Sequence, residues 1–154
     1  MTDDLAPYAD LERALTRLIR RAFLPTSGEA TRREADVGLE RAAYATLVRI
    51  AELEAGRLSD LAEVLGLDAS TTSRHVKGLV DAGYVEVTAD PDDARARRYS
   101  PTAAGRDALE RVRDTRRAHL ARVLHDWEPD EVTTLADGLD RIVTAFENDE
   151  RQRA

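Results

Sequence analysis

The sequence contains no cysteine among its 154 residues. This absence excludes disulfide bonds, thiolate metal sites and redox sensing by cysteine. The sequence also lacks any apolar run near the roughly 18 residues that a membrane-spanning helix needs. Its acidic beginning, residues 1–4, has neither the basic nor the apolar region of a secretory signal peptide. We therefore expect a cytoplasmic protein.

Aromatic residues are scarce, at 5% of the sequence, and Lys77 is the only lysine among 23 basic residues. The formal net charge of −7 argues by itself against a nucleic-acid partner, so the placement of the arginines matters more than the sum. Apolar residues make up 42% of the sequence, which is enough for a core and excludes wholesale disorder. Because alanine and leucine dominate and β-branched runs are few, this core is expected to be mainly helical.

Motifs that carry catalysis are also missing from the sequence. Nothing resembles a glycine-rich phosphate loop, an activated nucleophile or a metal-ligand spacing. The three histidines, His75, His119 and His125, are scattered without the paired spacing of a metal site. We therefore expect no enzymatic activity, no cofactor and no metal. A small hydrolytic enzyme is the least favoured alternative, and it would need a pocket with converging carboxylates.

Apolar spacing and capping residues predict six helices and one hairpin. The expected helices cover residues 5–24, 39–54, 60–65, 69–82, 103–125 and 129–147. The expected strands cover 84–88 and 97–101, with a turn at 90–93. Pro25 is expected to end the first helix, and residues 25–38 are expected to form a polar connection. We also expect Ser59 to cap the third helix and the tail from residue 148 to fray. The fold class is mainly α with a small two-stranded β-wing.

The two short helices in the middle of the chain carry the functional pattern. They are joined only by Gly66-Leu67-Asp68, so the apolar residues of the first must pack on those of the second at a large angle. This packing turns the opposite face of the second helix outward. That face carries polar side chains of graded length that can donate hydrogen bonds to base edges and phosphates in a major groove, namely Ser70, Thr71, Arg74, His75 and Lys77.

The hairpin that follows has a basic tip, with Arg95, Arg97 and Arg98. These side chains can reach phosphates or a narrow minor groove beside the helix. Because Arg97 and Arg98 alternate across a strand, only one of them is expected to face DNA. The acidic residues of the turn, Asp90, Asp92 and Asp93, are expected to turn the hairpin and to pair with nearby arginines.

The sequence resembles the MarR (multiple-antibiotic-resistance regulator) family of winged helix-turn-helix regulators. The motifs that carry the resemblance are LSDLAEVLGL at 58–67, STTSRHV at 70–76, LVDAGYV at 79–85, DPDD at 90–93 followed by Arg95, and TAAG at 102–105. The resemblance implies a single domain over 1–154, with the winged helix-turn-helix at 39–105 and dimerisation helices at 5–24 and 103–147. It implies a recognition helix containing residues 70–77, a wing at 84–101, and a DNA-contacting arginine at Arg95.

From these observations we expect a regulator that binds an inverted repeat in double-stranded DNA as a homodimer, acts as a repressor and is released by a small effector. The expected DNA-binding residues are Ser70, Thr71, Ser73, Arg74, His75, Lys77, Arg95 and Arg97. The resemblance also implies a small, often aromatic or phenolic, effector, for which Tyr44 and Trp127 are candidates and plain core packing is the alternative reading.

One count opposes strong DNA binding. Residues 58–101 hold five basic and eight acidic side chains, a net charge of −3. We therefore expect modest non-specific affinity and a specific mode that depends on a few good contacts. The open alternatives are a winged-helix module that binds proteins without specific DNA binding, and another winged-helix family that dimerises through different helices.

Overall fold

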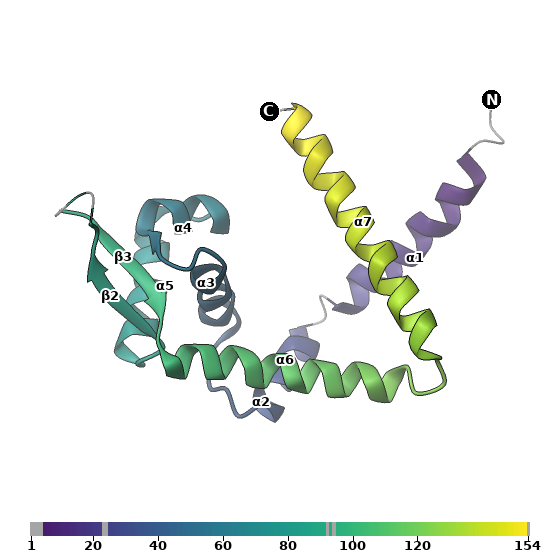
Figure 1. Ribbon diagram of the computed structural model, residues 1–154, viewed down its shortest axis with the longest axis horizontal. Helices are drawn as coiled ribbons and strands as arrows, with labels where there is room; N and C mark the ends of the chain where they lie inside the picture. Colours follow the sequence, from purple (N-terminus) through teal and green to yellow (C-terminus); the bar gives the residue numbers. More distant parts are fainter. Residues whose placement is uncertain (1–4, 23–24, 92, 94, 154) are drawn as a thin grey trace. The chain divides into compact units, whose positions relative to one another are not determined.

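The computed structural model describes residues 5–22, 25–91, 93 and 95–153 (Figure 1). The chain divides into two compact units, residues 1–116 and 117–154. In chain order the elements are α1 (Ala6–Ala22), α2 (Pro25–Glu34), α3 (Arg41–Glu52), β1 (Gly56–Arg57), α4 (Leu58–Leu65), α5 (Ala69–Asp81), β2 (Val85–Ala89), β3 (Arg97–Pro101), α6 (Ala103–Val123) and α7 (Pro129–Arg153). The expected mainly helical class is confirmed.

The strands form one small antiparallel sheet in the order β1-β3-β2. In the hairpin, Val85 lies opposite Pro101 and Ala89 opposite Arg97. The third strand, β1, adds Gly56 opposite Tyr99 to the other edge of β3. The sequence predicted only the hairpin, because a strand of two residues is too short to show alternation.

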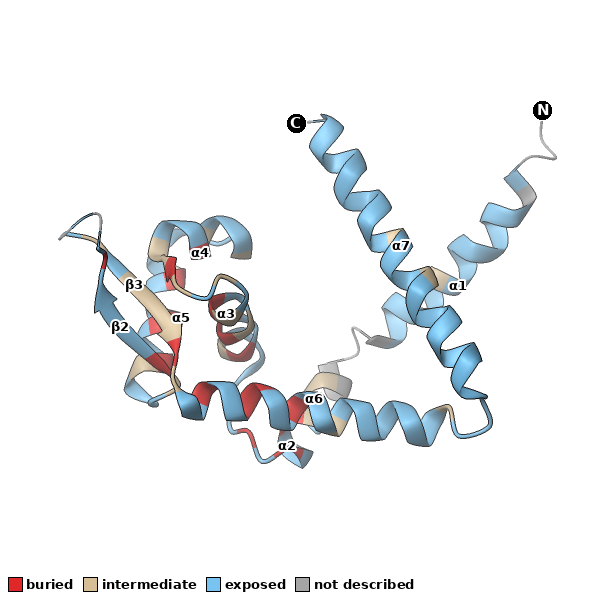
Figure 2. Cartoon of the chain, viewed as in Figure 1, coloured by how far each residue is buried: buried red, intermediate tan, exposed pale blue. Residues whose placement is uncertain are grey.

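The core lies between α3, α4, α5, β2 and the first half of α6, where the buried segments gather (Figure 2). The side chains of Leu47, Ile50, Leu61 and Leu79 are completely buried there. At the start of α6, Gly105 packs so closely on the backbone just before β2 that a Cβ at this position would lie 2.2 Å from the carbonyl oxygen of Tyr84. The core therefore joins the two short helices, the sheet and the first half of α6 into one packed body.

A helix cap at Thr102 fastens the start of α6 to Gly83, which follows α5. The backbone N–H of Gly105 donates to Oγ1 of Thr102 at 3.1 Å. The same hydroxyl donates to the carbonyl oxygen of Gly83 at 2.7 Å. This cap sets where the wing ends and the long helix begins.

Three expectations about helix ends were wrong. The polar connection predicted over 25–38 is instead helical from Pro25 to Glu34, and Pro25 begins this helix α2 because proline fits the first turn of a helix; the predicted end of the first helix at residue 24 lies outside the described residues. Helix α4 begins at Leu58, and Asp60, not Ser59, accepts the N–H of Arg57 at 3.0 Å. Helix α7 continues to Arg153, six residues beyond the predicted end at 147, with an ion pair of Arg153 to Asp149 at 3.0 Å in its last turn.

The terminal helices carry apolar side chains that the described part of the chain leaves in contact with solvent. In α7 these include Leu135, Leu139 and Phe146, which recur at helical spacing. In α1 they include Leu11 and Leu18. Within the described residues, no helix combines the length and the apolar composition that crossing a membrane would require.

Candidate nucleic-acid interface

The turn between α4 and α5 determines which face of α5 points outward. Gly66 ends α4 with a φ of +63°, and its N–H donates to the carbonyl oxygen of Glu63 at 3.1 Å. Leu61 of α4 is buried together with Val76 and Leu79 of α5. Because this side of α5 is packed into the core, the opposite side is left to solvent.

Most of the predicted contact residues of α5 lie on the solvent side. Ser70, Ser73, Arg74 and Lys77 are exposed, whereas Thr71 and His75 are half-buried. Nδ1 of His75 lies 3.5 Å from Oγ1 of Thr46, a buried hydroxyl that donates to the carbonyl oxygen of Ala42 at 2.9 Å. His75 therefore sits at the edge of the outward face, against α3, a position that the sequence alone did not indicate.

Asp68 caps the first turn of α5. Its carboxylate accepts the backbone N–H groups of Ser70 and Thr71 at 3.0 and 2.9 Å. It also accepts the hydroxyl groups of the same two residues, at 2.6 and 2.7 Å. These hydrogen bonds, of which the one from the Ser70 hydroxyl is the largest cause, hold the pKa of Asp68 well below its usual range. Both hydroxyl hydrogens are thus committed within the protein, although the sequence suggested that they would be free to donate to DNA.

The wing tip presents two arginines to solvent. Arg95 is exposed, and its backbone N–H donates to Oδ1 of Asp93 at 2.9 Å, which confirms the turn role expected for that acid. Arg97 is exposed at the start of β3, whereas Arg98 is half-buried. Arg97 is thus the more exposed of these two neighbours, and which of them faces DNA stays a prediction. Asp92 lies outside the described residues.

A buried carboxylate braces the wing at its tip end, where β2 passes into the turn. The side chain of Asp90 is completely buried, and its Oδ2 accepts Nε of Arg57 at 2.7 Å and Nε of Arg98 at 2.8 Å. The hydrogen bond and the charge of Asp90 raise the pKa of Arg57. Since Arg57 immediately precedes α4, the brace ties the wing to the helix-turn-helix. The sequence predicted that Asp90 pairs with arginines, but not that Arg57, which lies 33 residues away, is one of them.

Replacing Asp90 with alanine is expected to weaken DNA binding about tenfold, which is less than the loss of one direct base contact of about 1–3 kcal/mol in each half-site. Without the carboxylate, Arg57 and Arg98 repel each other and the wing loses its fixed position beside α5. Fluorescence anisotropy with a labelled duplex measures the change. Glu86→Ala on β2 is the matched control, because it removes the same charge from the same hairpin; equal effects of the two variants would show that the brace does not position the wing.

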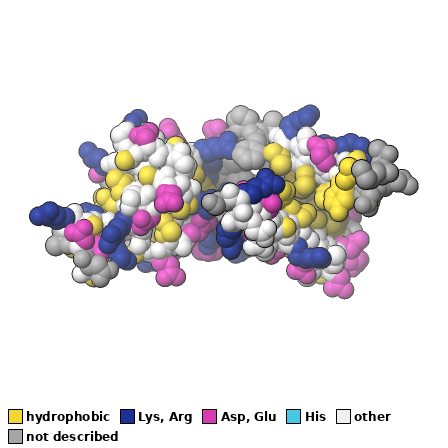
Figure 3. All heavy atoms as spheres, turned by 90° about the horizontal axis from the view of Figure 1, so that it is seen from above, with side chains coloured by type: hydrophobic (Ala, Val, Ile, Leu, Met, Phe, Trp, Pro, Cys, Tyr) yellow, Lys and Arg dark blue, Asp and Glu magenta, His cyan; other side chains and the backbone are white. Residues whose placement is uncertain are grey.

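One face of the molecule carries charged side chains of both signs (Figure 3). On the face drawn in Figure 3, basic and acidic side chains alternate without one large basic patch. This agrees with the net charge of −7. Electrostatic attraction to phosphates is accordingly limited, and recognition depends on individually placed side chains.

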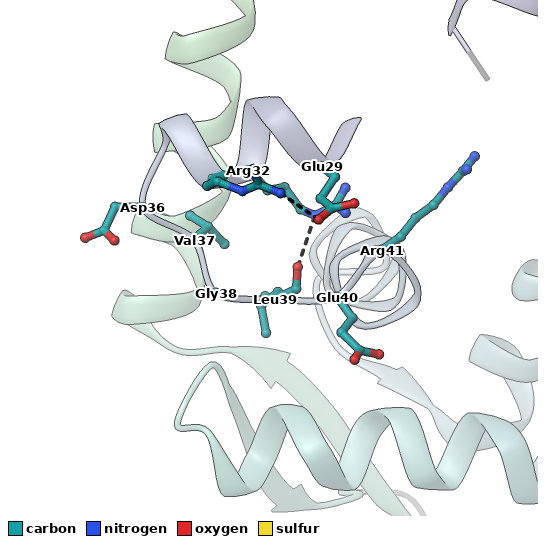
Figure 4. A pocket seen from close by; sticks show the side chains of 9 residues that line it. Glu29, Arg32, Asp36, Val37, Gly38, Leu39, Glu40 and Arg41 are labelled. Atoms are coloured by element: carbon teal, nitrogen blue, oxygen red, sulfur yellow. Dashed lines mark hydrogen bonds and ion pairs between the residues drawn. The ribbon is translucent and has the colours of Figure 1, made fainter. Parts of the chain in front are cut away.

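The candidate effector residue Tyr44 lies in the core. Only 6% of its surface is exposed, and the guanidinium carbons of Arg32 and Arg116 lie 6.0 and 5.4 Å from the centre of its ring. Arg32 is itself buried, and its Nε donates to the carbonyl oxygen of Leu39 at 3.0 Å (Figure 4). The guanidinium groups of Arg32 and Arg116 and the surrounding core therefore determine the position of the Tyr44 ring.

A cavity of about 630 Å³ opens beside Arg32, between α2 and the start of α3 (Figure 4). It is lined by Glu29, Arg32, Arg33 and residues 36–41. The second effector candidate, Trp127, is 44% exposed and belongs to the other compact unit. An effector role for either aromatic residue stays a prediction. In the part of the chain that the structure describes, no group of three or more metal-ligating side chains comes together.

Comparison with known proteins identifies the family of this architecture. The sequence model of the MarR family matches residues 39–96, which hold α3, α4, α5, β2 and the wing tip. The HTH-type transcriptional regulator YxaD of Bacillus subtilis is 30% identical over 141 residues, which cover 91% of this chain and 95% of YxaD. These relatives are regulators of transcription and not enzymes.

Solved structures share the fold. Wild-type MarR of E. coli in its apo form has a TM-score of 0.63 at 24% identity and covers 83% of this chain and 95% of its own. Streptococcus pneumoniae FabT, solved in complex with DNA, has a TM-score of 0.68 at 16% identity and covers 92% of this chain and 98% of its own. The two structures support the same winged helix arrangement as α4, α5 and the sheet described above.

Proposed function

Because the chain belongs to the MarR family of transcriptional regulators, we propose that it is a repressor that binds an inverted-repeat operator as a homodimer. The observation that carries the proposal is the outward face of α5, with Arg74 at its centre and the braced wing beside it. Such a helix fits a major groove, and the wing tip then lies near the backbone or the adjacent minor groove. FabT, a neighbour in fold, was solved with DNA.

The proposed roles of the residues follow from their exposure. Arg74 and Lys77 reach base edges or phosphates from α5, Ser70 and Ser73 approach the bases, and Arg95 and Arg97 contact the backbone from the wing. Thr71 and His75 contribute at the edge of the face. In this proposal the winged helix-turn-helix spans 39–105. A regulator of this kind works where the chromosome lies, which in a bacterium is the cytoplasm.

The homodimer is supported by the apolar stripes of the terminal helices, within 5–24 and 103–147. Exposed apolar faces of this length are covered in stable proteins by a partner, and two-fold symmetry pairs each face with its copy. The same symmetry presents two recognition helices to successive major grooves, with half-site centres about 10 bp apart. A small effector would release the DNA only if it binds better to a dimer with another spacing of these helices.

Replacing Leu139 with aspartate is expected to turn the dimer into a monomer and to lower operator affinity with it. The side chain is exposed in the single chain, so the charge disturbs little there, but in a dimer it would be buried without a partner. Sedimentation equilibrium gives the mass, and circular dichroism reports the helix content. Thr144→Asp is the control, because it adds the same charge on the opposite face of α7; if Leu139→Asp remained a dimer, this helix would not form the interface.

Selection of bound duplexes from a random DNA pool tests the proposed function itself. The purified protein is incubated with the pool at two salt concentrations, and the recovered sequences are read after several rounds. We expect an inverted repeat with half-sites one helical turn apart. No enrichment at either salt concentration, from a protein that is folded and dimeric, would contradict the proposal.

A further inference from the structure

The first turn of α5 differs from an uncapped helix end in the hydrogen-bonding groups that it offers DNA. An uncapped helix N-terminus has free N–H groups that attract a phosphate. Here the carboxylate of Asp68 already accepts the N–H groups of Ser70 and Thr71, at 3.0 and 2.9 Å. A phosphate would meet a negative charge in place of free donors. This end of α5 is therefore closed to the DNA backbone.

The two hydroxyl groups beside it are turned into acceptors. An ionised carboxylate can only accept hydrogen bonds, so Ser70 and Thr71 must each point the hydroxyl hydrogen toward Asp68, at O–O distances of 2.6 and 2.7 Å. Each hydroxyl oxygen then has only its lone pairs left for DNA, so it can only accept a hydrogen bond there. Ser70 is exposed and can present them to a base, while Thr71 is half-buried behind it.

Acceptors discriminate among bases in the major groove. The only donors on base edges there are the N6 amine of adenine and the N4 amine of cytosine, whereas guanine and thymine present acceptors at the corresponding positions. Building on the DNA-binding role proposed above, we propose that Asp68 is a specificity-determining residue, which makes Ser70 and Thr71 hydrogen-bond acceptors so that the first turn of α5 selects adenine or cytosine on the strand it faces.

Parallel selections from the random duplex pool test this proposal with the wild-type chain, Asp68→Asn and Ser70→Ala. Asparagine keeps the helix cap, because its side-chain oxygen still accepts the backbone N–H groups, but it removes the charge and adds a donor. Ser70→Ala leaves Asp68 and its cap in place and removes the acceptor that is best placed for a base. Asp81→Asn, at the other end of α5, is the control for the change in charge alone. Thermal unfolding followed by circular dichroism verifies that each variant is folded.

The wild-type motif is expected to contain, in each half-site, a position restricted to adenine or cytosine on one strand. Changing that base to guanine or thymine should weaken wild-type binding about tenfold and should leave Ser70→Ala and Asp68→Asn nearly unaffected. Asp81→Asn should return the wild-type motif. A motif that is identical for the wild type, Asp68→Asn and Ser70→Ala overturns this proposal but leaves the operator-binding function standing. A wild-type chain that enriches no motif at all overturns the proposed function, and this proposal with it.

Discussion

Replacing Arg74 and Arg95 together with alanine is expected to lower the affinity for the selected operator by at least about 1,000-fold. Each arginine that contacts a base or a phosphate well contributes about 1–3 kcal/mol, and a dimer loses each contact twice. Both side chains are exposed, one in the middle of α5 and one at the wing tip, and no ion pair holds either guanidinium within the described residues. They are therefore available to DNA, whereas Arg98 is occupied by Asp90.

Fluorescence anisotropy titration with the selected duplex measures this loss, and sedimentation verifies that the variant is still a dimer. The matched control is Arg49→Ala with Arg113→Ala, which removes the same charge from two arginines that pair with Glu52 and Glu110 on their own helices. The control should bind nearly as well as the parent. If the Arg74 and Arg95 double variant also bound like the parent, the proposed interface would be misplaced.

Replacing Gly105 with alanine is expected to destabilise the fold by about 3 kcal/mol or more. The new Cβ would lie 2.2 Å from the carbonyl oxygen of Tyr84, which is a backbone atom at the start of the wing. This oxygen also accepts the N–H of Thr102 at 3.0 Å, so it cannot move without breaking the junction of wing and helix. Overpacking at a site that cannot relax reaches the upper end of the usual cost.

Urea unfolding followed by circular dichroism measures the effect as a lower midpoint. Gly138→Ala in α7 is the control, because a Cβ there meets nothing within 4 Å. Alanine favours a helix over glycine by about 1 kcal/mol, so this variant should be as stable as the parent or slightly more stable. A Gly105→Ala chain that unfolds at the parent's urea concentration would show that α6 and the wing are not packed as closely as described.

The elements that the sequence predicted well are those with a long apolar period or a clear cap. The recognition helix is an example, because Asp68 before it and the buried Val76 and Leu79 within it determine both its start and its inner face. The sequence did not predict helix α2 or strand β1, because both lack such signals. The sequence of α2, PTSGEATRRE, has no apolar stripe, and β1 has only two residues.

For the candidate site, the sequence predicted which side chains are near the outward face but not which hydrogen bonds and ion pairs each of them forms. The pairing of Arg57 with Asp90 joins residues far apart in the chain, and no local pattern reveals it. His75 is at the edge of the face because α3 supplies a hydroxyl beside it. The commitment of Ser70 and Thr71 to Asp68 did leave a signal, since an aspartate followed by hydroxyl residues two and three positions later is a common local hydrogen-bonding arrangement.

The salt dependence of binding to a mixed-sequence duplex tests most directly whether this winged helix is a DNA-binding unit at all. The affinity of the wild-type dimer is measured by anisotropy between about 50 and 200 mM salt. If about four phosphates are neutralised per dimer, the affinity should fall on the order of 100-fold over this range. Binding that is absent, or present but unchanged by salt, would contradict the account and would point to a module that recognises another protein.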